Sequence, residues 1–407
     1  MSKQRAESKA PAGKQAVLLI FLLSGFAGLV YEVVWARQLV LVFGNTTEAI
    51  SAILTGFFGG MALGSVLGGR IADRVRSPLR MYAILELLVV VAVLLTPLTF
   101  TGLHEVYRGA FGTLQQDPTM LALVRFGLSI LALSPATVLM GATLPTLSRQ
   151  LVRDHASLGH EFGELYLVNT AGAIYGAVIS GIFLIELIGL NGTLLVGVAC
   201  SATAGLAALV LSRRLGRPEN ATAIVGVATP APQSETSIMS MAPLGLPVAT
   251  LSRPRLALVV AFVSGLTALG YQTLWTRLLA SGTGSTSYVF TSILIIFLTG
   301  IAIGAYIFSR FLYRTRHPVA LLGIAELSLA VLVLATLGVE TSFFAPVSLT
   351  LGLLIVVAPA TLVMGIVFPM SSMLVADSDE RVGASAGLLL GSNTLGAICG
   401  TSSCHSS

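Results

Sequence analysis

Long apolar runs, separated by short polar or basic segments, make up most of the chain. A hydrocarbon core about 30 Å thick requires about 20 apolar residues per helix, so these runs predict about eleven membrane-spanning helices. The runs are continuous, whereas the strands of a membrane barrel alternate, so the pattern favours helices. The predicted spans lie at 17–43, 47–69, 81–100, 120–147, 165–187 and 193–211, and then at 256–281, 288–308, 319–337, 349–374 and 383–400.

The composition agrees with a protein of the bilayer. Hydrophobic residues are 55% of the chain, charged residues 10%, and the mean hydropathy is +0.90, which leaves too little polar surface to cover a soluble particle of 407 residues. The net charge of +5 could suggest nucleic acid, but the basic residues are spread among the segments between spans. We therefore expect the lipid bilayer as a partner and no nucleic acid.

The basic residues also predict the orientation of the chain. If the N-terminus is cytoplasmic, nearly every Lys and Arg outside the spans falls on the cytoplasmic side, and Arg108 is the exception. We therefore expect a multi-pass protein of the inner (cell) membrane with a cytoplasmic N-terminus.

The chain repeats itself at an offset of 240 residues. Between Ser24 and Leu94, 25 of 71 ungapped positions are identical to those 240 residues later, and they include Trp, Tyr, Arg and Pro, which apolar composition alone would not align. The later part of each half matches at an offset of 224, where "PATVLMGATLP" returns as "PATLVMGIVFP" and "NTAGAIYG" as "NTLGAICG". An even number of spans in each half gives both halves one orientation. We predict an all-α, polytopic membrane bundle of two parallel six-helix repeats, laid out as in major facilitator transporters.

The second repeat is incomplete in this sequence. After "NTLGAICG" only "TSSCHSS" follows, where the first repeat finishes one helix and builds another. Either a frameshifted or truncated reading frame or a natural short form explains this, and we favour the first because small polar residues match the bilayer poorly. The expected organisation is a cytoplasmic tail at 1–15, the first repeat at 16–213, a cytoplasmic linker at 214–255, the second repeat at 256–400 and an aberrant tail at 401–407.

Four motifs in order carry a resemblance to a known family. They are "SGFAGLVYEVVWARQL", "FFGGMALGSVLGGRIADR", "PATVLMGATLP" and "NTAGAIYG". The chain resembles the membrane domain of bacterial fused major-facilitator and spermidine-synthase-like proteins, in a truncated form. The resemblance implies a transporter-like membrane domain that family members join to a soluble aminopropyltransferase-like domain.

The segment "GRIADRVRSPLR" is similar to the loop signature between the second and third helices of major facilitators. It contains Asp73, Arg74 and Arg76, which we assign to a gating and topology loop. Asp73 can pair with nearby arginines or with a helix N-terminus, while the basic cluster anchors the loop at the cytoplasmic face. In the second repeat Tyr313 stands at the equivalent of the aspartate.

The first span carries a polar and aromatic stripe within the membrane. On a helical wheel Tyr31, Glu32 and Trp35 fall within one arc, and the equivalent residues of the second repeat are Tyr271, Gln272 and Trp275. One interpretation is packing, with Glu32 hydrogen-bonded to a neighbouring helix. The other is a central site for an amine or another cation, because a carboxylate and aromatic faces attract cations in a low dielectric. These six residues are the candidate substrate-binding residues.

Other polar residues inside the spans allow the same two interpretations. They are Glu86, Glu326, Arg125, Asn169 and Asn393. We expect the two asparagines to bridge helices, and the glycines repeated every four residues near them to allow close packing.

The sequence contains no pattern that indicates catalysis. No nucleotide loop follows a strand, no histidine pairs with a nucleophile, and no metal-ligand spacing occurs. We therefore expect no catalytic residue, no metal and no cofactor in this chain. Three hypotheses remain: a transporter-like protein for polyamines or related small cations, a membrane anchor for an absent aminopropyltransferase-like domain, and a nonfunctional fragment.

Overall fold

The computed structural model describes residues 12–43, 47–114, 117–152, 155–215, 253–283, 286–315, 317–337, 349–375 and 381–403. All regular secondary structure in these ranges is helical. The first repeat contains α1 (Ala12–Phe43), α2 (Thr47–Ala72), α3 (Pro78–Leu114), α4 (Pro118–Gly141), α5 (Thr143–Leu151), α6 (His155–Val178), the π-helical turn η1 (Ile179–Leu184) and α7 (Ile185–Leu215).

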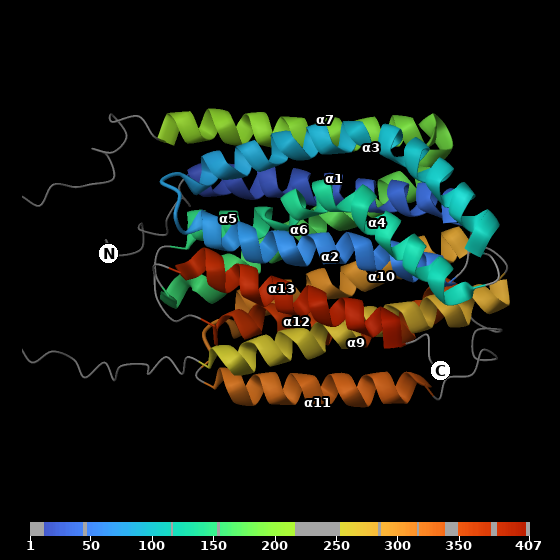
Figure 1. The fold of residues 1–407 in the computed structure, drawn as a ribbon. Coiled ribbons are helices and arrows are strands. Elements are labelled where there is room, and N and C mark those ends of the chain that lie inside the picture. The colour runs from blue at the N-terminus through green and yellow to red at the C-terminus, as the bar shows by residue number, and fades with distance from the viewer. Residues whose placement is uncertain are drawn as a thin grey trace, which may run out of the picture.

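The second repeat follows the same order. It contains α9 (Pro254–Thr283), α10 (Thr286–Ile307), the π-helical turn η2 (Phe308–Leu312), α11 (Pro318–Leu337), α12 (Leu349–Ser372) and α13 (Val382–Ser403). Figure 1 shows the helices lying roughly along one direction, with α3 and α7 at one edge of the bundle and α11 at the opposite edge. α2 and α13 lie between the two edges, where the repeats meet.

The predicted all-helical membrane bundle is confirmed. Nine stretches of the described residues are long and apolar enough to cross a membrane. One of them, 159–214, contains two predicted spans, divided where Gly189 takes a φ of 70° that favours glycine. The remaining predicted span, 47–69, lies in α2, a helix of 26 residues that is not one of these nine stretches. The prediction for the third span was too short, because α3 continues past Phe100 to Leu114.

The two repeats use the same close contacts. In the first repeat, a Cβ added to Gly172 of α6 would lie 2.0 Å from the carbonyl oxygen of Leu22 in α1. In the second, a Cβ added to Gly396 of α13 would lie 1.8 Å from the carbonyl oxygen of Phe262 in α9. These pairs are equivalent under the two sequence offsets, so the duplicated sequence folds into duplicated helix packing.

The repeats are joined more firmly at one end of the bundle than at the other. One hydrophobic cluster contains buried residues of both repeats, including Phe162, Phe308 and Phe368, and it lies where α1, α3, α9 and α11 begin. Toward the other end, one cluster belongs to the first repeat alone and another to the second alone. A small contact of Val33 and Ala177 with Leu294 joins the repeats near the middle. The bundle is therefore closed at the end that holds Asp73.

Parts of the expected domain organisation lie outside the described residues. They are residues 1–11 of the N-terminal tail, 216–252 of the linker and 404–407 of the C-terminal tail. Within the described part, α7 ends at Leu215, α9 begins at Pro254, and α13 continues to Ser403, beyond the expected end of the second repeat at residue 400.

Candidate functional site

The aromatic residues of the first span lie in the packing of the first repeat. Tyr31 and Trp35 are each 1% exposed, and their rings stack with centroids 5.5 Å apart. Trp35 donates from Nε1 to Thr96 Oγ1 of α3 at 3.4 Å and meets Phe57 of α2 edge to face. Tyr31 lies against Gly197 of α7. Both rings therefore orient α1 against the other helices of its own repeat.

Glu32 lies toward the side of α1 that meets other elements. Gly25 and Gly28, two turns and one turn before it, lie against Asn169 of α6 and Met140 of α4. Val33, the next residue, packs with Leu294 of α10 in the second repeat. The Glu32 side chain is 9% exposed, and its carboxylate has no hydrogen bond or ion pair with any described residue. It is thus a buried acid close to the seam between the repeats.

The second repeat keeps the aromatic packing but replaces the acid. Tyr271 donates from its hydroxyl toward Thr336 Oγ1 at 3.1 Å and toward the carbonyl oxygen of Val356 at 3.2 Å. Trp275 is 2% exposed and meets the Tyr271 ring edge to face. Gln272, at the position equivalent to Glu32, is also buried. The two equivalent positions therefore differ in charge but not in burial.

Asp73 joins the two repeats at the closed end. Its Oδ1 accepts from the backbone N–H of Gly383, and its Oδ2 accepts from that of Ala384, each at 2.8 Å. Both amides belong to the first turn of α13, where unpaired N–H groups and the helix dipole favour an anion. Arg149 Nε lies 3.5 Å from Asp73 Oδ1. Arg74 and Arg76 are exposed, whereas Asp73 contacts the second repeat.

A second contact between the repeats, at the equivalent place, was not predicted from the sequence. Tyr313 is equivalent to Asp73, and His160 in α6 is equivalent to Ala384 in α13. The rings of His160 and Tyr313 lie with centroids 4.7 Å apart, and Glu164 contacts His160 at 3.2 Å. The sequence offsets of 240 and 224 residues align this pair with Asp73 and Ala384, and they were the signal that could have predicted the contact.

The other polar residues in the spans have partners of different kinds. Glu86 is 2% exposed and accepts from the Ser24 hydroxyl within the first repeat. Asn169 donates to the carbonyl oxygen of Phe21 at 3.5 Å, and Asn393 to that of Ala261 at 3.0 Å, so each amide bridges two helices. Arg125 donates from Nε to the Tyr107 hydroxyl at 2.9 Å.

Glu326, the equivalent of Glu86, differs from it. Its Oε1 is buried without a hydrogen-bond partner among the residues that the structure describes. Within the same residues, no group of three or more His, Cys, Asp or Glu side chains could hold a metal ion.

Two repeats of membrane helices, joined at one end through α2 and α13, are a transporter architecture. The model of the Major Facilitator Superfamily matches residues 16–401. The chain belongs to this superfamily. The major-facilitator part of the resemblance is therefore confirmed, while the link to spermidine-synthase-like proteins stays a prediction.

Solved structures of transporters share the fold at low sequence identity. A bacterial homologue of the iron transporter ferroportin, in an outward-facing state, has a TM-score of 0.60 and 16% identity, covering 96% of this chain and 91% of that one. The E. coli fucose:proton symporter FucP has a TM-score of 0.55 and 14% identity, covering 95% and 89%. The nucleoside transporter NupG has a TM-score of 0.51 and 16% identity, covering 96% and 89%. No curated protein sequence matches the chain.

Proposed function

We propose that the chain is the membrane part of a transporter that binds a small cation between its two repeats. Membership of the superfamily supports transport of a small molecule. The polar contacts of Asp73 with Gly383 and Ala384 support a gating role for this loop, because hydrogen bonds to a helix end can break and re-form as the repeats move.

The Glu32 carboxylate carries the proposal for a cation. It is buried in a membrane helix near the second repeat and has no partner among the described residues. A carboxylate in a low dielectric is costly unless a cation or a proton compensates it. A protonated amine that enters between the repeats would supply that compensation, and the neutral Gln272 would supply hydrogen bonds from the other repeat.

The aromatic residues have a supporting part in this proposal. Tyr31, Trp35, Tyr271 and Trp275 hold α1 and α9 in place through their packing, and so they set the directions in which Glu32 and Gln272 point. The resemblance to spermidine-synthase-like proteins makes a polyamine the first cation to test.

The test compares Glu32→Gln with wild type in the full chain, reconstituted in lipid nanodiscs, by calorimetric titration with spermidine. We expect Glu32→Gln to weaken binding by about tenfold or more, which is about 1.4 kcal/mol, at unchanged abundance and melting temperature. Glu86→Gln is the matched control, because Glu86 is also a buried acid of the first repeat but is hydrogen-bonded to Ser24 inside that repeat. Equal binding by Glu32→Gln and wild type would remove Glu32 from the site. Binding of uncharged solutes without binding of spermidine would contradict the proposal that the substrate is a cation.

A further inference from the structure

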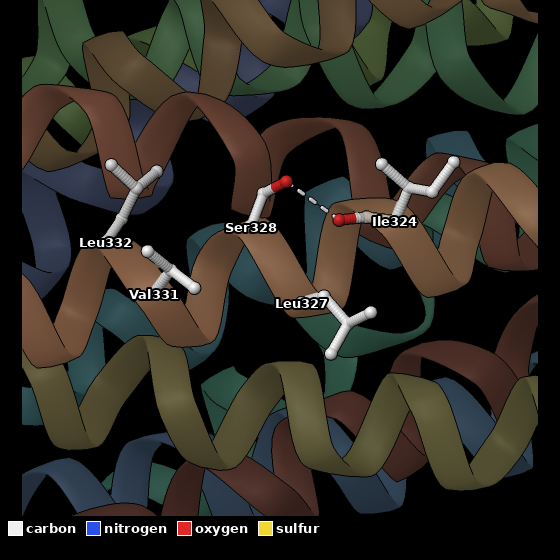
Figure 2. A pocket seen from close by; sticks show the side chains of 5 residues that line it. All are labelled: Ile324, Leu327, Ser328, Val331 and Leu332. Atoms are coloured by element: carbon white, nitrogen blue, oxygen red, sulfur yellow. Dashed lines mark hydrogen bonds between the residues drawn. The ribbon is translucent and has the colours of Figure 1, made fainter.

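The polar groups of the groove along α11 and of the seam between the repeats differ in whether they have partners. The groove has a volume of about 460 Å³, and Figure 2 shows its Ser328 hydroxyl bonded to the carbonyl oxygen of Ile324 at 2.8 Å. The other lining side chains are the apolar Leu327, Val331 and Leu332. By contrast, His160 at the seam has a buried Nδ1 with no hydrogen-bond partner among the described residues. An added proton would therefore change the balance at the seam.

The contact of His160 with Glu164 decides which ring nitrogen takes up a proton. His160 Nε2 lies 3.2 Å from Glu164 Oε1, so in the neutral imidazole Nε2 carries the hydrogen and donates to the carboxylate. Nδ1 then holds the lone pair, and a proton taken up from water converts the ring to imidazolium. Histidine makes this change of charge between about pH 5 and about pH 8. The proton therefore sits on the buried nitrogen that has no acceptor.

The charged groups beside His160 within the first repeat stay with it when the repeats move. Lys14 of α1 lies 2.8 Å from Glu161 and 2.7 Å from Glu164, and both acids belong to α6, as His160 does. Two carboxylates against one ammonium leave a net negative charge beside the ring. They support binding of a proton whether the closed end is shut or open, and so they do not favour either state.

The second repeat supplies the groups that His160 faces only when this end is closed. The Tyr313 ring lies with its centroid 4.7 Å from that of His160, and the Arg314 guanidinium lies over the same tyrosine ring at 5.1 Å. An aromatic face attracts a cation, but this face already has one. Protonation of His160 would bring a second positive charge to the same ring.

The rest of the seam around His160 is apolar. A Cβ added to Gly159 would lie 2.8 Å from Met373 Cγ, and one added to Gly163 would lie 3.2 Å from Phe308 Cδ1. α10 and α12, which also pack against α6, have no charged side chain. A buried N–H group without an acceptor is costly in such surroundings, and more so on a charged ring. Separation of the repeats would let water reach Nδ1.

Among the elements packed against α6, α5 contributes one further charge, on Arg149. Arg149 Nε lies 3.5 Å from Asp73 Oδ1, so this charge belongs to the other contact between the repeats. The Asp73 contact uses backbone N–H groups of α13, which do not titrate. The two equivalent contacts at the closed end therefore differ in their chemistry.

We propose that His160 is a pH-sensitive latch between the repeats, and that uptake of a proton on its Nδ1 favours opening of the closed end. The neutral ring packs on Tyr313 and donates to Glu164. The protonated ring keeps Glu164 but gains an unpaired donor and a charge that only water can solvate. The pH of the compartment that this end faces thus regulates the movement of the repeats. The proposal is independent of the transported substrate.

The experiment measures, by double electron–electron resonance, the distance between spin labels at Arg80→Cys and Ala320→Cys. Both positions are exposed, and they begin α3 and α11, which lie at opposite edges of the bundle. The full chain, with Cys200, Cys399 and Cys404 replaced by alanine, is reconstituted in lipid nanodiscs. We expect the fraction of molecules with the longer distance to rise about threefold to tenfold from about pH 8 to about pH 5.5.

Three variants assign the response. His160→Phe keeps a ring against Tyr313 but cannot bind a proton, so its distances should be the same at both pH values. Glu164→Gln removes the carboxylate beside Nε2, so the transition should shift to lower pH, an effect that a purely structural contact would not produce. His317→Gln is the matched control, because His317 is exposed at the same end of the bundle, and it should respond as wild type does.

Several results would overturn the proposal. A pH response that persists in His160→Phe, or that is lost in His317→Gln, would show that another group senses the pH. A longer-distance fraction that stays constant, or that falls as the pH is lowered, would contradict the proposed opening. If His160→Phe does not fold, Glu164→Gln decides alone, and an unchanged transition pH in that variant would remove His160 from the latch.

Discussion

The Asp73 carboxylate and the Gly383 backbone amide meet at 2.8 Å although they lie 310 positions apart. The contact joins the end of α2 to the start of α13, and the backbones are equally close there. A Cβ added to Gly69 would lie 2.2 Å from the Gly383 carbonyl oxygen. Movement that separates the repeats at this end must therefore break the Asp73 hydrogen bonds.

Asp73→Asn should favour the state in which this end is open. Asparagine keeps one acceptor oxygen but loses the second acceptor and the charge, and loss of a helix-end cap costs about 0.5–2 kcal/mol. The measurement is the alkylation rate of a reporter cysteine at Ser65, which is 0% exposed and donates to Gly387 on the same interface. We expect a rise of a few fold, up to about thirtyfold.

Arg74→Gln is the control for this experiment, because Arg74 is exposed on the same loop. In the Arg74→Gln variant the reporter cysteine at Ser65 should be alkylated at the wild-type rate. The same alkylation rate in Asp73→Asn as in wild type would mean that the Asp73 hydrogen bonds do not hold this end closed.

Gly172→Ala should destabilise the first repeat. The added Cβ would lie 2.0 Å from the Leu22 carbonyl oxygen, so α1 and α6 must move apart, and overpacking of this kind costs about 1–3 kcal/mol. Thermal unfolding in detergent measures the loss. Gly102→Ala in α3 is the matched control, because nothing lies within 4 Å of its added Cβ. Equal melting temperatures for the two variants would contradict the close packing.

Ser24→Ala should destabilise the chain through Glu86. The substitution removes the hydroxyl that donates to a carboxyl group only 2% exposed, and a buried polar group that loses a partner costs about 1–3 kcal/mol. Ser328→Ala removes a hydroxyl that bonds only within its own helix and should leave the melting temperature nearly unchanged. The prediction fails if both variants unfold at the same temperature.

The sequence predicted the fold through its two offsets. Because 25 of 71 positions repeat in register, the pairing of α1 with α6 implied the pairing of α9 with α13, and the glycines that the offsets align make equivalent contacts. The link between Asp73 and a helix N-terminus was also expected, and α13 supplies it. For Asp73 the chemistry of the residue itself was sufficient, because its partner, the N-terminal backbone N–H groups of a helix, is a feature that every helix presents.

The site itself was less predictable, because a helical wheel gives the direction of each side chain but not the residues that it contacts. Tyr31, Glu32 and Trp35 share one arc, yet the rings lie against α7, α3 and α2, while Glu32 has no partner among the described residues. Lys14 lies 2.7 Å from Glu164, and this contact depends on how α1 and α6 pack. Such contacts are set by tertiary packing between segments far apart in sequence.

The orientation of the chain gives the last prediction. The positive-inside rule places Arg76, which is exposed after α2, on the cytoplasmic side, and Arg108, whose side chain is 72% exposed near the other end of α3, on the outer side. A cysteine at Arg108 in intact cells should react with a membrane-impermeant maleimide, and a cysteine at Arg76 should react only after the membrane is permeabilised. The three native cysteines, Cys200, Cys399 and Cys404, should first be replaced by alanine so that each chain carries one reporter. Labelling of Arg76→Cys in intact cells, with Arg108→Cys protected, would show that the chain has the opposite orientation. The end closed by Asp73 would then face outward.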